Sequence, residues 1–181
     1  EGITFVRRYF REDGTFTGIH MRDKTNSPIV RHETEADSEM RVLRFDREGD
    51  KKDVVMVNYQ THYHGTFATK VSADFVHPLR QKVEKELDVH FAYHNGASGN
   101  LNFQSALGER KYKTLEKAAH AIGDTVIDAV SKEEKANLGT LQHEASYFKS
   151  RKNQEVRLYA FTIGDIGFVS APYEMFDVNG V

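Results

Sequence analysis

The sequence contains no cysteine, which excludes disulfide bonds, cysteine zinc ligands and thiol catalysis. It also has no apolar run of about 18 residues, the length that a membrane-spanning helix requires. The 25 basic and 27 acidic residues nearly cancel, and the net charge of -2 argues against a nucleic-acid-binding protein, which needs a basic face. The chain begins with Glu1 and shows no targeting segment, so we expect a processed protein or a piece of a longer one.

What is present suits a folded domain. The 181 residues are 39% hydrophobic and 11% aromatic, enough to build a core. We therefore expect a single domain over residues 1–181, a part of a larger domain. An abrupt stop just after the apolar pair Met175 and Phe176 also suggests that the natural protein continues.

Residues 54–102 organise the chain. An apolar, β-branched run at 54–57 predicts a buried strand, and apolar residues recur every four positions from Phe75 to Leu87, which is typical of one helix face. Ser72 is the expected N-cap of this helix, and a second short strand follows at 90–93. A strand, helix, strand unit of this length predicts two adjacent parallel strands with a right-handed helical crossover.

The remaining patterns add strands and a second helix. We expect a β-rich segment over residues 2–60, a helix at 114–131, a possible strand at 141–147 and a hairpin at 156–170. The segment 171–176 reads as the start of another helix because proline favours a helix N-terminus, whereas Pro78 should kink or tighten the first turn of the earlier helix. The predicted fold class is α/β in the mixed α+β sense: a mixed sheet with helices packed on it and a site at the strand carboxyl ends.

Polar residues follow both strands of the 54–102 unit. His62 and His64 stand two apart, so on an extended strand they would share a face and could share a metal; alternatively they are ordinary surface or hydrogen-bonded histidines. Residues 95–102, here called the Gly-rich loop, could present backbone N–H groups to an anion or could simply be a tight loop. Alone, Glu174 carries no signal.

Five short segments resemble, in order, the neutral/alkaline, non-lysosomal ceramidase family. They are residues 5–14 with two arginines and Asp-Gly, 57–62 ending in His62, 71–75, the Gly-rich loop, and 169–174 ending in Pro-Tyr-Glu. The resemblance spans almost the whole chain, although each motif is short.

The resemblance implies a zinc-dependent hydrolase of linear amide bonds, such as the N-acyl bond of ceramide in sphingolipid metabolism. It implies zinc ligands at His62 and Glu174, with two further ligands outside this chain. His64 would be a partner of a ligand or a proton shuttle, and Arg8 would hold a substrate oxygen. It also implies a lipid-like or other amide substrate and a secreted, periplasmic or cell-surface location.

Two positions depart from the family pattern. Asn102 stands where these ceramidases have a serine in the site, and Asn100 stands where they have an aspartate. An asparagine side chain does no acid–base chemistry. The alternative is a non-catalytic domain that binds carbohydrate or a protein partner through exposed aromatic residues such as Tyr9, Tyr63 and Tyr93.

Overall fold

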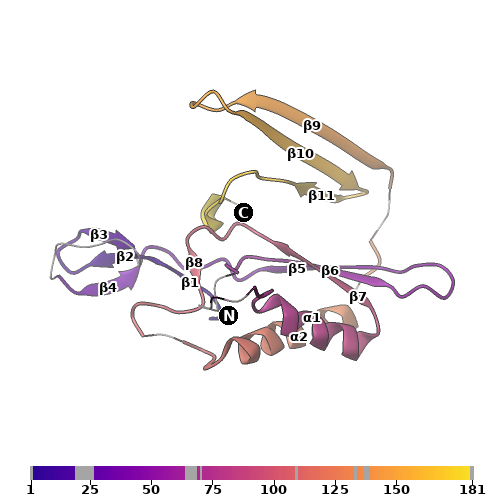
Figure 1. The fold of residues 1–181 in the computed structure, drawn as a ribbon, viewed down its shortest axis with the longest axis horizontal. Coiled ribbons are helices and arrows are strands. Elements are labelled where there is room, and N and C mark those ends of the chain that lie inside the picture. Colours follow the sequence, from indigo (N-terminus) through magenta and orange to yellow (C-terminus); the bar gives the residue numbers. More distant parts are fainter. Residues whose placement is uncertain are drawn as a thin grey trace. The chain divides into compact units, whose positions relative to one another are not determined.

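A computed structural model describes residues 2–18, 27–63, 69, 71–108, 110–132, 134–136 and 139–179. Its strands and helices confirm the mixed α+β class (Figure 1). The strands are β1 Phe5–Val6, β2 Arg8–Arg11, β3 Phe16–Gly18, β4 Ile29–His32, β5 Met40–Phe45, β6 Val54–Tyr59, β7 His90–Asn95, β8 Leu101–Asn102, β9 Leu141–Lys149, β10 Glu155–Ile163 and β11 Ile166–Val169. The helices are α1 Val76–Leu87, α2 Leu115–Ser131 and the short 3₁₀ helix η1 Asp177–Asn179.

The chain divides into two compact units. Unit 1 comprises the described residues of 1–132 and 176–181, and unit 2 comprises those of 133–175. Unit 1 therefore holds β1 to β8, both α-helices and η1, whereas unit 2 holds β9 to β11. That both units belong to one domain stays a prediction.

The central sheet of unit 1 has the strand order β5-β6-β7. β5 and β6 are antiparallel, whereas β6 and β7 are parallel with Val54 opposite His90 and Tyr59 opposite Asn95. Parallel neighbours need a crossover connection, and α1 lies between them in the sequence. The predicted adjacent parallel pair is confirmed.

Both α-helices pack on one another along one face of this sheet (Figure 1). Alternate residues of β6 point into the core, and they meet the apolar faces of α1 and α2. Burial of each large apolar side chain stabilises the fold by about 1.5–3 kcal/mol. The fully buried core residues are Val55, Val57, Phe75, Leu79, Val83, Ala119, Ile122 and Val126.

The start of α1 differs from the prediction. The helix begins at Val76, because Asp74 adopts a left-handed conformation at φ 52° and Ser72 accepts a hydrogen bond from the Asp74 N–H instead of capping a helix. Pro78 is then the third helical residue. The first four N–H groups of a helix have no intrahelical acceptor, so proline removes no bond there. The expected kink or tightening of the first turn stays a prediction.

In unit 2 the predicted hairpin is confirmed. β10 pairs with β11 across a turn in which Gly164 has φ 57°, and it pairs with β9 along all nine residues. The possible strand at 141–147 is therefore real and extends to Lys149. The predicted helix start at 171–176 is wrong, because the Met175 N–H bonds to the Tyr173 carbonyl at 3.0 Å, a turn tighter than any helix.

Two small sheets complete unit 1. β1 pairs with β8, and β2 pairs with β3 and β4, all antiparallel. The β1–β8 pair joins the N-terminal segment to the Gly-rich loop. Among the residues that the structure describes, no helix is long and apolar enough to cross a membrane.

Candidate functional site

The carboxyl ends of β6 and β7 form a polar edge in unit 1. The Gly96 N–H donates to the Tyr59 carbonyl at 3.1 Å, and the Thr61 N–H approaches the Asn95 side-chain oxygen at 3.4 Å. These bonds tie the segment that leads to His62 to the Gly-rich loop. Parallel neighbours end on the same side of a sheet, so the polar residues that follow β6 and β7 lie at one edge, as the order of elements predicted.

Gln60 and Gly96 are closely packed at this edge. A Cβ on Gly96 would lie 2.9 Å from Gln60 Cγ, so only glycine lets the loop approach. The Gln60 Nε2 donates to the Asp37 carboxylate, which orients the amide and leaves Oε1 on the other side. Gln60 Oε1 and Thr61 Oγ1 are both buried without a hydrogen-bond partner among the described residues. Such atoms are uncommon in folded proteins and are compatible with a polar ligand group binding here.

Hydrogen bonds within the Gly-rich loop fix its conformation. Asn95 Nδ2 donates to Ser98 Oγ at 2.8 Å, and the Leu101 N–H donates to the Ser98 carbonyl at 2.9 Å. The Gly96 and Leu101 N–H groups are both bonded within the protein, so these two donors of the predicted anion site are not available to an anion. We therefore interpret the loop as a structural part of the site and not as an anion-binding group of backbone N–H donors.

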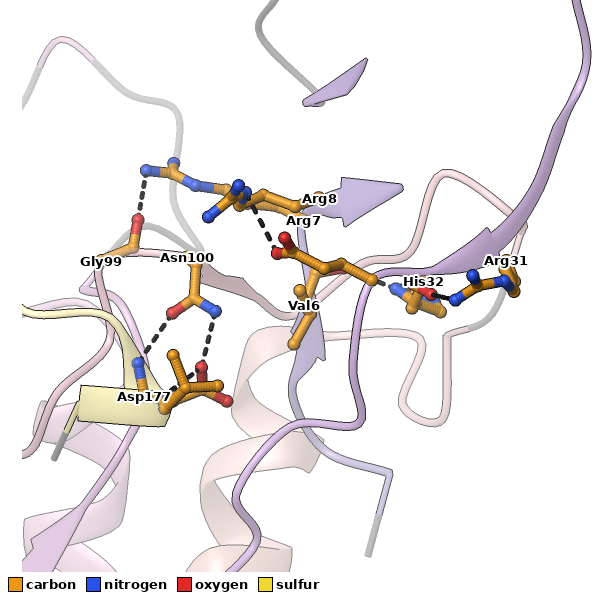
Figure 2. Close-up of polar contacts among 10 residues, drawn as sticks. Val6, Arg7, Arg8, Arg31, His32, Gly99, Asn100 and Asp177 are labelled. Carbon is orange, nitrogen blue, oxygen red and sulfur yellow. Dashed lines mark hydrogen bonds and ion pairs between the residues drawn. The ribbon is translucent and has the colours of Figure 1, made fainter. Parts of the chain in front are cut away.

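Asn100 is hydrogen-bonded to Asp177, which lies near the C-terminal end of the chain (Figure 2). Its Nδ2 donates to Asp177 Oδ1 at 2.6 Å, and its Oδ1 accepts the Asp177 N–H at 2.9 Å. The Asp177 carboxylate also accepts the N–H groups of Val178 at 2.8 Å and Asp37 at 3.2 Å. Both ends of the Asn100 amide are thus engaged, so the side chain positions the C-terminal segment against the loop. Asp177 carries no signal in the sequence, because its partner Asn100 lies 77 residues away.

The two consecutive arginines have different roles (Figure 2). Arg7, which the sequence did not single out, donates from Nη2 to the Gly99 carbonyl at 2.7 Å and from its backbone to the Asn100 carbonyl at 2.7 Å. Arg8, the predicted substrate residue, pairs with Glu33 at 3.1 Å. Its guanidinium also lies over the ring of Phe176, 5.1 Å from the centroid. Successive residues of an extended chain point to opposite sides, so only one of the pair can face the loop.

The other predicted site residues are distributed as follows. His62 is half-buried and lies three residues beyond Tyr59, the last residue of β6. Asn102 is half-buried in β8, opposite Phe5. His64 lies outside the described residues. Glu174 is exposed and belongs to unit 2, so its meeting with His62 stays a prediction.

An aromatic cluster adjoins His62. Tyr63, 47% exposed, stacks on Phe75 with ring centroids 5.7 Å apart, and Tyr93 meets both rings edge-on. The Tyr93 hydroxyl donates to the Tyr59 carbonyl at 2.8 Å, and burial raises the pKa of that phenol above its usual range. Tyr9 is fully buried, with its hydroxyl accepting the Ala106 N–H, so its expected role as an exposed aromatic is wrong.

The predicted ligands are of types that bind zinc, but they are fewer than a zinc site normally uses. Imidazole and carboxylate are ordinary zinc ligands, and zinc sites normally use three or four protein groups. Within the described ranges no three histidine, aspartate or glutamate side chains are grouped as a metal would need. Comparisons with protein-family models, curated proteins and solved structures find no match for the chain.

Proposed function

We propose that this chain is part of a zinc-dependent amide hydrolase of the ceramidase type, with its site at the carboxyl ends of β6 and β7. One observation carries the proposal. Three separate segments contact the Gly-rich loop in unit 1: the Arg7 segment, the strand that leads to His62 and the Asp177 segment. The Arg7 segment, the strand that leads to His62 and the Gly-rich loop are among the segments that resemble the family, and Asp177 follows another of them, residues 169–174.

His62 and Glu174 are the proposed zinc ligands. When bound, zinc would supply a water activated for attack on an amide carbonyl. The proposal needs at least one further ligand, which is His64 or a group outside residues 1–181. Asn100 and Asn102 provide no acid–base group, so Asn100 positions the loop through Asp177, and Arg8 is left to hold a substrate oxygen beside its Glu33 partner.

Zinc calorimetry tests the ligand assignment. We expect the 181-residue chain to bind zinc weakly, and a longer natural protein that contains it to bind tightly through His62. His62→Ala should abolish tight binding in the longer protein. His90→Ala is the matched control, because His90 is exposed at the opposite end of the same parallel strand pair.

Hydrolysis tests the reaction. The longer protein should release fatty acid from an N-acyl sphingosine, should lose this activity with a chelator and should lose it with His62→Ala but not His90→Ala. Zinc binding that survives His62→Ala would refute the assignment. Tight zinc binding with no amide hydrolysis would favour the binding-domain alternative, for which the exposed Tyr63 ring is the contact that remains.

A further inference from the structure

Unit 2 has almost no buried side chains. Of its described residues, Val156 alone is buried, at 6% exposure, whereas all nine residues of β9 are exposed. A small sheet needs buried apolar surface to be stable. Unit 2 therefore has strand surface that a partner could cover.

β9 is an edge strand without the features that usually prevent pairing. In the described part of the chain it pairs with β10 alone (Figure 1), and that register runs without a bulge from Leu141 to Lys149. Natural proteins block such edges with proline, bulges, short strands or charges. β9 has nine residues, no proline, and one charged side chain, Glu144, away from its ends. About half of its backbone N–H and C=O groups point away from β10.

The opposite edge of the same sheet is less suited to pairing. β11 has only four residues, and one of them is Gly167, which weakens a strand because it has no side chain to pack. Pro172 lies three residues beyond the end of β11 and has no N–H to donate to a neighbouring strand. The long edge of β9 is therefore the one that suits a further strand.

The sequence of β9 is compatible with pairing to a second copy of itself. In an antiparallel pair related by a two-fold axis, only the register centred on Ala145 pairs all nine residues. In that register Glu144 lies opposite Ser146, and Lys149 lies opposite Leu141. No like charges face each other directly. The two Glu144 carboxylates are diagonal neighbours, about 7–8 Å apart, on an exposed face.

This pairing would also cover exposed aromatic surface. Tyr147 and Phe148 are 56% and 44% exposed, and successive strand residues point to opposite faces, so each face of β9 carries one ring. In the joined sheet they would lie opposite His143 and Gln142 of the second copy. Cross-strand neighbours at such positions stabilise a sheet by packing their side chains together.

We infer that two copies of this chain associate through β9, so that their two three-stranded sheets become one continuous antiparallel sheet. Main-chain hydrogen bonds provide the affinity in this kind of strand addition, and the side chains fix the register. Because the β11 edge is short, association stops at the dimer. This inference goes beyond the proposed hydrolase and needs no metal.

Sedimentation equilibrium of the 181-residue chain in the presence of EDTA tests the dimer. Ala145→Lys should raise its Kd by roughly tenfold or more, because two lysines would then face each other across the two-fold axis. Ala160→Lys is the matched control. Ala160 is also an exposed strand alanine, but it lies in the central strand β10, so its substitution should leave the dimer Kd near the native value.

Mixing two charge variants tests the register. Ala145→Glu alone should also weaken self-association, for the same reason as Ala145→Lys. An equimolar mixture of the two variants should restore association as a heterodimer, because opposite charges would then face each other. Recovery in the mixture also separates a charge effect from a failure to fold.

Several results would overturn the inference. They are a native chain that stays monomeric at its highest soluble concentration, equal effects of Ala145→Lys and Ala160→Lys, and a mixture of charge variants that stays monomeric. A dimer formed by the 181-residue chain but not by a longer natural protein would assign the β9 edge to the additional residues, which overturns it as well. Because EDTA is present throughout, none of these outcomes bears on the hydrolase proposal.

Discussion

Asn100 and Asp177 form a closed pair of hydrogen bonds, at 2.6 and 2.9 Å, between the Gly-rich loop and the last described helical turn. Both residues are buried, at 2% and 1% exposure. A buried carboxylate is stable only when its oxygens accept enough hydrogen bonds, and the Asn100 amide supplies one of them. The family that the sequence resembles has aspartate at position 100. In this chain the position requires asparagine, because only an amide can donate a hydrogen bond to the Asp177 carboxylate.

Asn100→Asp should therefore be severely destabilising. The change removes the donor to Asp177 and buries two carboxylates side by side, which should lower the free energy of unfolding by about 3 kcal/mol or more. Urea unfolding at pH 7 measures it. The double variant Asn100→Asp with Asp177→Asn should recover part of the loss, because one amide again faces one carboxylate. A single variant with native stability would show that this pair contributes nothing.

Gly96→Ala should disturb the contact between the loop and β6. The new Cβ would meet Gln60 Cγ at 2.9 Å, and Gln60 is 1% exposed and held by Asp37, so it has little room to move. We expect a loss of about 1–3 kcal/mol in the free energy of unfolding. Gly167→Ala is the control, since no atom lies within 4 Å of its added Cβ. Equal effects of the two substitutions would contradict the packing described here.

Thr61→Val should stabilise the protein. The Thr61 hydroxyl is buried and has no hydrogen-bond partner in the described part of the chain, so replacing it with a methyl group removes a desolvation cost of about 1 kcal/mol. Thermal unfolding measures the gain. Ser105→Ala is the contrasting control: that buried hydroxyl lies 2.9 Å from His32 Nε2 and accepts the Leu107 N–H, so its loss should destabilise. A Thr61→Val variant that loses both stability and any measured ligand binding would mean that the hydroxyl has a partner in solution.

Alkaline pH should weaken the fold through Tyr93. Burial raises the pKa of this phenol above its ordinary value of 10.0, so above that pH the unfolded chain releases a proton that the folded chain retains. The unfolded state then binds fewer protons, and the free energy of unfolding falls as pH rises past 10. Tyr93→Phe should cost about 1 kcal/mol at pH 7, because the bond to the Tyr59 carbonyl is lost, and should flatten this alkaline decline.

Denaturant unfolding between pH 8 and about 11 checks the decline. Tyr147→Phe is the control, since that ring is 56% exposed. If the two variants show the same alkaline slope, burial of Tyr93 is not its cause.

The sequence by itself determined the local elements. The β-branched run of β6, the four-residue apolar repeat of α1, the apolar helix of α2 and the hairpin of β10 and β11 each reflect neighbours along the chain, and each prediction is confirmed. The parallel pairing of β6 and β7 also followed, because a helix between two strands leaves few other connections.

Only the tertiary structure decided which side chains meet at the candidate site. Asp177 reaches Asn100 across 77 residues, Arg7 rather than Arg8 binds the loop, and Tyr9, which looked available, is buried. None of these contacts is periodic, so no pattern along the chain marks them. Periodicity reports which face of an element is apolar, whereas the partner of a polar side chain depends on how distant segments close around it.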